Sequence, residues 1–453
     1  MKKRLSALLL AGAVALSLLG VSALAADEET ASQDSSAAQT DGQVEESEAP
    51  DASQESGEES ESGESGGSGE SGENGDDQQE EEYVPDPIGS ITFENLERRL
   101  RENNLTLLAL EENIKAIEVI DYDKMYEDLR QNMNKIAQAQ WMMILYGMGD
   151  SPEAKALEQS YAALEDTFES LKEGELQKDN ADAVWQLENA QNQVVMAGES
   201  LYIAIMEMEQ NARSLDRNIA ALDRSLEELE LRYELGQISS QTLKQTQASK
   251  TSLVSSKQTL DSNITNYKMQ LELMSGGELN GTIQLGALPK VTDEQLQDMN
   301  LDADLETAKG KSYELYVARQ DLDEAYETYD ENGGQYAATT DKYEYDMAAH
   351  TYEAAKYNYS ATIQNFEISF RTLYFQVKDF KQVLDAAKTA LAVEQDNYAV
   401  SQLKFEQGNL SENDLLEAED KVKEAQEKVE GAENDLFSAY NNYRWAVDYG
   451  ILN

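Results

Sequence analysis

The sequence predicts an all-α protein made of two tandem repeats, each a long antiparallel coiled-coil hairpin. Only two prolines, Pro152 and Pro289, occur after residue 90, and a shortage of helix breakers favours long helices. Apolar residues recur at alternating spacings of four and three, which is the heptad of a coiled coil. A short pattern around a glycine occurs twice, at Gly236 and again 172 residues later at Gly408, as expected for an internal repeat.

The first 25 residues have the three-part form of a secretory signal peptide. Three basic residues, 2–4, precede an apolar run from Leu8 to Leu19 and a small-residue site that ends at Ala25. The run is too short to indicate a membrane span. We therefore expect residues 1–25 to be removed on export, with retention as an N-terminal anchor as the alternative.

Residues 26–88 form the next predicted segment, an acidic linker rich in Ser, Gly and Glu. Between Asp27 and Glu82 there are roughly twenty acidic residues and no Lys or Arg. Such a composition offers too little apolar surface to bury, so the linker is expected to be disordered. Its simplest role is that of a solvating spacer, and a specific binding role is the alternative.

Charge and composition exclude several classes of function. The formal net charge of -53 excludes a basic nucleic-acid-binding surface, and the absence of cysteine excludes disulfides and a lipid-anchored N-terminal cysteine. With His350 as the only histidine, the chain lacks the common zinc-ligand sets and shows no His-based nucleophile system. No Gly-rich phosphate loop is present. We therefore expect no enzyme activity and neither a metal nor another cofactor.

The first helical unit is expected to begin at Ser90 or Thr92, because either residue can cap a helix that continues through Ile117. More helix follows to Tyr146. Glycine can end one helix and proline suits the first turn of the next, so turns are expected where these residues gather. Such a turn is predicted at 147–152, and another break is predicted at 172–180.

A coiled-coil seam runs along the helix predicted from Ala181 to Leu235. Its positions alternate by four and three: Leu201, Ile205, Met208, Ala212, Leu215, Ile219, Leu222, Leu226, Leu229 and Tyr233. Shifting this set by the repeat offset leads to the series from Leu373 to Phe405, in which eight of the ten positions remain apolar. Both copies therefore share one register, and a helix of this length measures about 80 Å.

After each glycine the apolar alternation returns, which predicts an antiparallel partner helix. In the second copy the alternation continues as far as Ala446. In the first copy Lys250 and Lys257 interrupt it. We interpret these lysines as residues at a helix edge whose charged ends reach solvent, and a ligand role is the alternative.

The two repeats are expected to span residues 89–280 and 281–453. The boundary lies in a linker that includes a short strand predicted at 282–285. Beyond it we expect a helical run from Leu305 to Tyr329. An interruption is predicted at 332–334, where two glycines follow an asparagine.

The repeated bend resembles the TolC-like outer-membrane efflux family. Two stretches in the same register carry the resemblance, 231–239 (LRYELGQIS) and 403–411 (LKFEQGNLS), and each is followed four residues later by a leucine. The opening is also similar, since 91–96 (ITFENL) and 103–107 (NNLTL) match the family's usual first helix. The resemblance covers the chain from about Ser90 to its C-terminus.

The resemblance implies a homotrimer in which each chain contributes two helical hairpins to one hollow barrel that conducts solutes passively. It also implies two partners, a membrane-fusion adaptor protein that meets the bends and a pump in the inner or cytoplasmic membrane. The plain alternative is that each glycine only closes a hairpin. The adaptor-contact residues implied by the resemblance are Tyr233, Leu235, Gly236, Ile238, Ser239, Phe405, Gly408, Leu410 and Ser411.

Family members also carry acidic side chains just past the second bend, where they line a constricted entrance. Asp414 and Glu417 occupy the matching positions, and their spacing places both carboxylates on one helix face. Threefold symmetry would then stack them as acidic rings, whereas a solvated helix face is the rival interpretation. The basic residue that often partners such acids is missing, because Leu410 stands in its place.

The sequence departs from the family in the part that would meet the membrane. Family members interrupt each half with a pair of β-strands that together close a transmembrane barrel, and such strands read as alternating segments of about ten residues. No such segments are found, so we expect this variant to lack the β-barrel. We then expect an exported protein of the cell envelope. In the family this location is the outer membrane, and the absence of the strands favours a place in or beside the cell wall, or at the extracytoplasmic surface, as the alternative here.

Two functions from different classes follow from these features. The first is a secreted helical duct subunit of a multipart efflux system, which docks an adaptor through its bends and performs no chemistry. The second is a coiled-coil structural spacer or surface protein of the envelope with no transport activity. Oligomer mass separates the two, because a duct requires a closed trimer with a hollow axis.

Overall fold

The computed structural model describes residues 86–336 and 342–452. The predicted signal peptide and most of the predicted acidic linker lie outside these residues. No helix in the described part is long and apolar enough to cross a membrane.

In chain order the elements are β1 (Ser90–Ile91), α1 (Phe93–Asn103), α2 (Leu105–Glu118), α3 (Tyr122–Leu145), α4 (Pro152–Glu173), α5 (Glu175–Glu234), α6 (Ser240–Met274), β2 (Gln284–Leu285), α7 (Asp293–Asp298), α8 (Leu301–Lys311), α9 (Tyr313–Tyr336), α10 (Lys342–Glu406) and α11 (Glu412–Tyr449).

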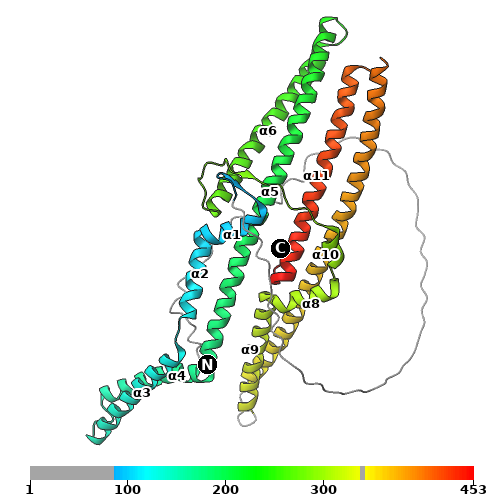
Figure 1. Cartoon of the computed structure of the whole chain (residues 1–453). Coiled ribbons are helices and arrows are strands. Elements are labelled where there is room, and N and C mark those ends of the chain that lie inside the picture. Colours follow the sequence, from blue (N-terminus) through cyan, green and yellow to red (C-terminus); the bar gives the residue numbers. More distant parts are fainter. Residues whose placement is uncertain (1–85, 337–341, 453) are drawn as a thin grey trace, which may run out of the picture. The chain divides into compact units, whose positions relative to one another are not determined.

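Two hairpins of long helices dominate the fold (Figure 1). Helix α5 has 60 residues and packs along α6, and helix α10 has 65 residues and packs along α11. Each strand has two residues, so nearly all of the described backbone is helical or lies in short connections. The predicted fold class, an all-α chain with two tandem helical hairpins, is confirmed.

The predicted seams form the contact between the helices of each hairpin. On α5 the side chains of Leu201, Ile205 and Leu226 are buried, and on α10 those of Val377 and Leu384 are buried. These residues recur on the face that a heptad keeps turned toward the partner helix.

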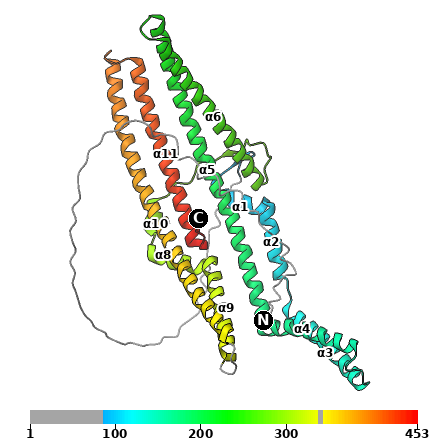
Figure 2. The same ribbon diagram turned by 180° about the vertical axis from the view of Figure 1, so that it is seen from behind.

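The two hairpins contact each other through α5 and α11, which run side by side (Figure 2). Three arginines of α5 pair with acids of α11 in antiparallel order: Arg213 with Glu430, Arg217 with Glu427 and Arg224 with Asp420. Single ion pairs at exposed positions contribute little stability, but a series of them fixes the register of one helix against another. The long helices therefore follow the order α6–α5–α11–α10.

A buried polar cluster joins α5 to α11 farther from the bends. Glu199 of α5 is 2% exposed, and its Oε2 accepts hydrogen bonds from Asn441 Nδ2 at 2.7 Å and Trp445 Nε1 at 2.6 Å. Burial raises the pKa of the Glu199 carboxyl, and the two hydrogen bonds offset this only in part. Next to it, Gly198 lets α1 approach closely, because a Cβ there would lie 2.5 Å from Leu100 Cδ1.

The segment after α6 is held in place by one carboxylate. Glu272, which is 2% exposed, accepts backbone N–H hydrogen bonds from residues 280–283 at distances between 2.7 and 3.0 Å. These bonds satisfy the amides that lead into β2, which pairs in parallel with β1. Tyr202 of α5 completes the arrangement by donating from its hydroxyl to the carbonyl of Gly286 at 2.8 Å.

The prediction of one unbroken helix through Ile117 is wrong. Asn104 has an extended backbone, with φ −73° and ψ 117°, and divides this segment into α1 and α2. Its side chain caps α2 by accepting hydrogen bonds from the N–H groups of Thr106 and Leu107. A short amide side chain competes for backbone donors in this way, so an asparagine can start a new helix inside an apolar pattern.

Two helix boundaries in the second half were also predicted wrongly. The run from Leu305 to Tyr329 is divided at Ser312, whose Oγ accepts a hydrogen bond from Leu315 N–H at 3.3 Å. Residues 332–334 do not interrupt a helix, because α9 continues to Tyr336. Glycine lowers helix propensity by about 1 kcal/mol, a cost that neighbouring helical turns can outweigh.

Candidate functional site: the two helical bends

The two bends are built alike. Gly236 and Gly408 have positive φ angles of 71° and 75°, the left-handed conformation that glycine adopts at little cost. Each is the turning residue of a Schellman motif. The matching hydrogen bonds run from Gly236 N–H to Tyr233 O and from Gln237 N–H to Arg232 O, and from Gly408 N–H to Phe405 O and from Asn409 N–H to Lys404 O.

A serine starts the returning helix after each bend. Ser239 Oγ accepts a hydrogen bond from Thr242 N–H at 3.3 Å, and Ser411 Oγ accepts one from Asp414 N–H at 3.2 Å. Both are N-caps, which supply a partner for an otherwise unpaired amide at the start of a helix. The serine that the two sequence stretches share thus has the same capping role at both bends.

Most of the predicted adaptor-contact residues lie in two exposed tips with apolar side chains. In the first tip Tyr233 and Leu235 are 45% and 63% exposed, and in the second Phe405 is 40% exposed. Ile238 and Leu410 are half-buried beneath the bends. Grouped large apolar residues on a surface mark interaction sites more often than single ones do.

Leu231 and Leu403 are two further exposed residues at the tips. They are 58% and 57% exposed and occupy equivalent positions at the start of the repeated stretch. Both leucines belong to the repeated motif, but they were not predicted as contact residues. Both leucines precede a bend and lie outside the coiled-coil seam, and this place in the sequence could have identified them as exposed tip residues.

Asp414 and Glu417 lie in the first turns of α11, and both are exposed. Asp414 Oδ2 accepts a hydrogen bond from Ser411 Oγ at 2.6 Å, so it belongs to the capping of the helix. Glu417 lies 3.0 Å from Lys421 Nζ, one turn further along. The acidic face therefore begins directly after the second bend and carries one compensating lysine.

Lys250 and Lys257, which interrupt the seam of α6, form ion pairs across the first hairpin. Lys250 pairs with Asp223 of α5, and Lys257 Nζ lies 3.4 Å from Asp216 of α5 and 2.9 Å from Asp261 of its own helix. The two acids of α5 are seven residues apart, as the two lysines are. The lysines thus link α6 to α5 along one edge of the hairpin.

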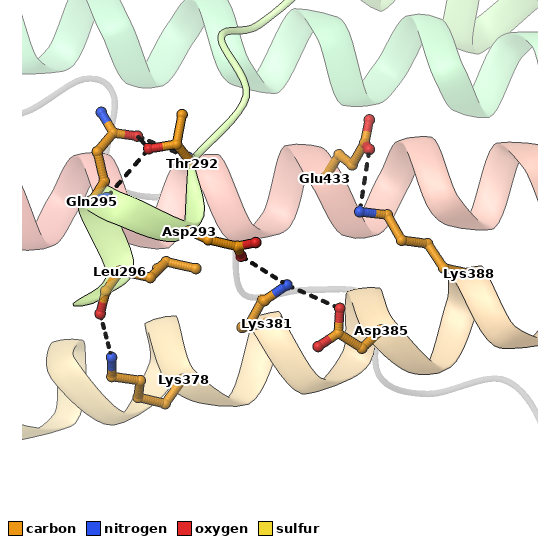
Figure 3. A network of polar contacts seen from close by, with 9 residues as sticks. All are labelled: Thr292, Asp293, Gln295, Leu296, Lys378, Lys381, Asp385, Lys388 and Glu433. Atoms are coloured by element: carbon orange, nitrogen blue, oxygen red, sulfur yellow. Dashed lines mark hydrogen bonds and ion pairs between the residues drawn. The ribbon is translucent and has the colours of Figure 1, made fainter.

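Helix α7 is fastened to the second hairpin by a polar network (Figure 3). Lys378 Nζ donates to the carbonyl of Leu296 at 2.8 Å, and Lys381 Nζ lies 3.3 Å from Asp293. Lys388 Nζ lies 3.9 Å from Glu433 of α11. These lysines flank the buried face of α10 and leave the opposite face of the helix uncovered.

The uncovered face of α10 is a second apolar seam, which was not predicted from the sequence. Its members have large, exposed side chains. Because successive residues of a helix are about 100° apart, these residues all lie within an arc of about 100° around the helix axis. They are Ile368, Phe375, Val383, Val393 and Val400, with exposed fractions of 63%, 54%, 51%, 52% and 50%. Pairs of these residues are seven apart, so a search for a second heptad on the same helix would have found them.

The outer face of α6 has the opposite character. Opposite its seam it carries small residues with hydroxyl groups, and several of these hydroxyls donate to the carbonyl four residues earlier in the same helix. Such bonds are made by Thr251 at 2.9 Å, Thr259 at 3.2 Å and Ser262 at 2.9 Å. Because these donors are already satisfied, a second surface can cover them at little cost.

No group of three or more His, Asp or Glu side chains in the described part is placed to hold a metal ion. His350 is exposed on α10.

Comparison with known proteins gives similarity at the level of structure alone. No family model and no curated protein sequence matches the chain. Similar solved structures include the outer membrane protein VceC from Vibrio cholerae, which is 11% identical in sequence and has a TM-score of 0.46. The similarity covers 78% of this chain and 95% of the VceC chain. A membrane protein from Pseudomonas aeruginosa has 10% identity, covers 78% and 90% of the two chains, and has a TM-score of 0.48.

The MtrE outer membrane channel of Neisseria gonorrhoeae, in its open state, is similar over 80% of this chain and 89% of its own, with 14% identity and a TM-score of 0.39. At TM-scores below 0.5, none of these likenesses carries an argument about function. The two tandem helical hairpins with matching bends, predicted as a TolC-like fold, are present in the chain.

Proposed function

We propose that this chain is an exported helical duct subunit of a multipart efflux system. In this proposal it forms a homotrimer, meets a membrane-fusion adaptor through its two bends and conducts solutes passively to or from a pump in the inner or cytoplasmic membrane. In the order α6–α5–α11–α10, the two outer helices are α6 and α10. The observation that carries the proposal is that the outward face of α10 and the outward face of α6 are complementary.

Because the outward faces of α6 and α10 differ, a closed ring of copies is favoured over a two-fold dimer. When one surface of a chain fits a different surface of the next copy, the contact is heterologous and closes into a ring if the rotation allows. Here α10 offers an apolar seam, and α6 offers small residues between which apolar side chains can insert as knobs into holes. The ring size of three is taken from the family resemblance.

Both bends lie at the same end of the described unit, which suits a single docking partner. The pair of Arg224 with Asp420 links α5 to α11 at a point twelve residues from each bend glycine, about 18 Å along the helices. An adaptor with a complementary apolar surface would cover Leu231, Leu235 and Leu403, whose exposure in water is otherwise unfavourable.

The acidic face formed by Asp414 and Glu417 would then lie near the end of the duct that meets the adaptor. In a ring of three copies each residue is repeated by symmetry, so the carboxylates form two stacked rings if this face points to the axis. Such rings attract cations and repel anions at the entrance. Replacing both acids with their amides is expected to weaken that selectivity without changing helix content.

The bend substitutions Gly236→Asp and Gly408→Asp test adaptor docking. No atom lies within 4 Å of a Cβ added at either glycine, so the cost is limited to backbone strain of about 1 kcal/mol. Aspartate tolerates the left-handed conformation better than most residues, so both variants should fold. We expect loss of adaptor co-purification with an unchanged far-UV circular-dichroism spectrum.

Gly174→Asp is a matched control for these variants. Gly174 has a positive φ of 80° and equally open surroundings, but it lies between α4 and α5, away from both bends. Adaptor recovery with this variant should equal that of the unmodified chain. Equal recovery with all three variants, or equal loss with all three, would remove the docking proposal.

A further inference from the structure

The turn between α3 and α4 exposes a continuous apolar surface that the proposed duct does not use. Residues 136–149 contain no charged side chain, although 28% of the whole chain is charged. Their large apolar members are mostly exposed: Trp141 at 62%, Met142 at 48%, Ile144 at 58%, Leu145 at 63%, Tyr146 at 72% and Met148 at 49%. A surface of this kind in a soluble setting marks a site that something else covers.

The two helices that carry this turn pack on each other. Tyr126 of α3 stacks on Phe168 of α4 with ring centroids 4.9 Å apart, and Ser151 caps α4 by accepting a hydrogen bond from Ala154 N–H at 3.2 Å. Helix α4 in turn packs on the start of α5. The exposed residues are therefore confined to the far end of the hairpin (Figure 1) and are not the result of a missing contact along its length.

The composition of the exposed residues indicates what covers them. Trp141, Met142, Ile144 and Leu145 lie within an arc of about 160° on one side of the last turns of α3, and Tyr146 and Met148 are exposed in the turn that follows. The residue types are those of interfacial anchors, with Trp and Tyr beside aliphatic side chains. Residues 136–149 also contain no charge that would have to leave water when a fluid apolar medium surrounds the turn.

We propose that the α3–α4 turn inserts into one leaflet of a lipid bilayer. The uncharged part of α3 has about ten residues and measures about 15 Å, about half of the hydrocarbon core. Asp150, within the turn itself, and Glu153, in the first turn of α4, limit insertion to the headgroup and upper acyl region. With these acids beside the tip, neutral zwitterionic lipid suits the site better than anionic lipid.

This insertion would fix the direction of the molecule relative to a membrane. Helix α5 begins beside α4 and ends at the Gly236 bend, and its 60 residues extend over about 90 Å. The lipid-contacting turn and the two bends thus lie at opposite ends of α5. Lipid binding requires neither a ring nor an adaptor, so it can be tested separately from the proposed function.

Trp141 provides a direct readout of insertion. Among the three tryptophans Trp141 is exposed, whereas Trp445 is 2% exposed and Trp185 packs against Tyr313 and Tyr316. The chain without its predicted signal peptide is mixed with phosphatidylcholine vesicles and then separated by flotation. We expect the chain to float with the vesicles, and its tryptophan emission to shift to shorter wavelength and be quenched by brominated acyl chains.

Two variants distinguish insertion of the tip from adsorption through another surface of the chain. Trp141→Phe keeps the apolar tip, so flotation should persist while the emission shift disappears. The double variant Ile144→Ser and Leu145→Ser should weaken partitioning by about 30- to 100-fold, because two largely exposed apolar side chains no longer reach lipid. Leu231→Ser, a similarly exposed leucine near the other end of α5, is the control and should float like the unmodified chain.

Several results would overturn the proposal. These are no flotation with phosphatidylcholine, flotation that requires anionic lipid, or equal flotation of the Ile144→Ser and Leu145→Ser variant. A Trp141 emission shift that grows with protein concentration in the absence of vesicles would also overturn it, since a second copy of the chain would then cover the tip.

Discussion

Glu199 is the residue at which the contact between the two hairpins can be tested most sharply. We compare two substitutions, Glu199→Gln and Glu199→Leu. The glutamine carbonyl can occupy the position of Oε2 and accept from both Asn441 and Trp445, whereas leucine accepts from neither. The two variants have similar size, so the difference between them isolates the two hydrogen bonds that join α5 to α11.

The expected magnitudes follow from the burial of the cluster. In the leucine variant the donors of Asn441 and Trp445, which are 4% and 2% exposed, lose their acceptor. Each buried unsatisfied donor costs about 1–3 kcal/mol, so Glu199→Leu should lower the free energy of unfolding by about 2–6 kcal/mol. Glu199→Gln weakens both bonds but avoids burying a charge, and its net effect should stay within about 1.5 kcal/mol.

The pH dependence provides an independent check on the same residue. Burial raises the pKa of Glu199 in the folded chain above its ordinary value, so between the unfolded and folded pKa values the folded chain retains a proton that the unfolded chain releases. Stability from this group therefore falls as the pH rises through that window. Relative to the Glu199→Gln variant, the unmodified chain should become more stable as the pH is lowered through it.

Urea unfolding followed by far-UV circular dichroism, at several pH values, measures both effects. A leucine variant as stable as the glutamine variant would refute the role given to the two hydrogen bonds. An identical pH dependence of the unmodified chain and the glutamine variant would refute the assignment of a raised pKa to Glu199.

Three further predictions concern packing and charge. Glu272→Gln must place an amide NH₂ against backbone donors, so unfolding should become easier by about 2 kcal/mol or more in urea titration. Gly198→Ala should cost about 1–3 kcal/mol in the same assay, because its Cβ would overlap Leu100. Burial and the neighbouring charge of Asp435 raise the pKa of Glu207, so Glu207→Gln should raise the melting temperature at pH 7 and have no such effect below the usual carboxyl pKa.

The long helices and their bends could be predicted from the sequence because their signals are local and repeated. A heptad that extends over many turns specifies a helix and its buried face at once. Gly236 and Gly408 were identifiable because a helix reversal requires positive φ, and the serine after each bend indicates the next helix start. The break at 172–180 was also found, at Gly174, whose φ is 80°.

The missed features leave no mark in the apolar periodicity of the sequence. Asn104 and Ser312 divide helices because their side chains find backbone donors, and the apolar pattern continues across both positions. The repeat equivalent of α10 is α5, where Asn211 and Glu228 stand at the positions of Val383 and Val400, so positions shared by both repeats do not reveal the exposed seam of α10. The carboxylate of Glu272 gave no signal, since its partners are backbone amides of a later segment.

The proposed ring can be tested at its edges by Phe375→Ala. Phe375 is 54% exposed, and covering that fraction of a phenylalanine side chain is worth about 2–3 kcal/mol per contact. If α10 meets α6 of the next copy, the substitution should weaken assembly by about 30- to 150-fold per contact, measured by sedimentation equilibrium. Unchanged assembly would exclude this face of α10 from the interface.

The native mass of the chain without its signal peptide, combined with electron-microscopic class averages, tests the central claim most directly. We expect a trimer whose end views show a ring with a hollow axis. A monomer or dimer without such an axis, at concentrations at which the chain is fully folded, would contradict the duct and favour the structural spacer.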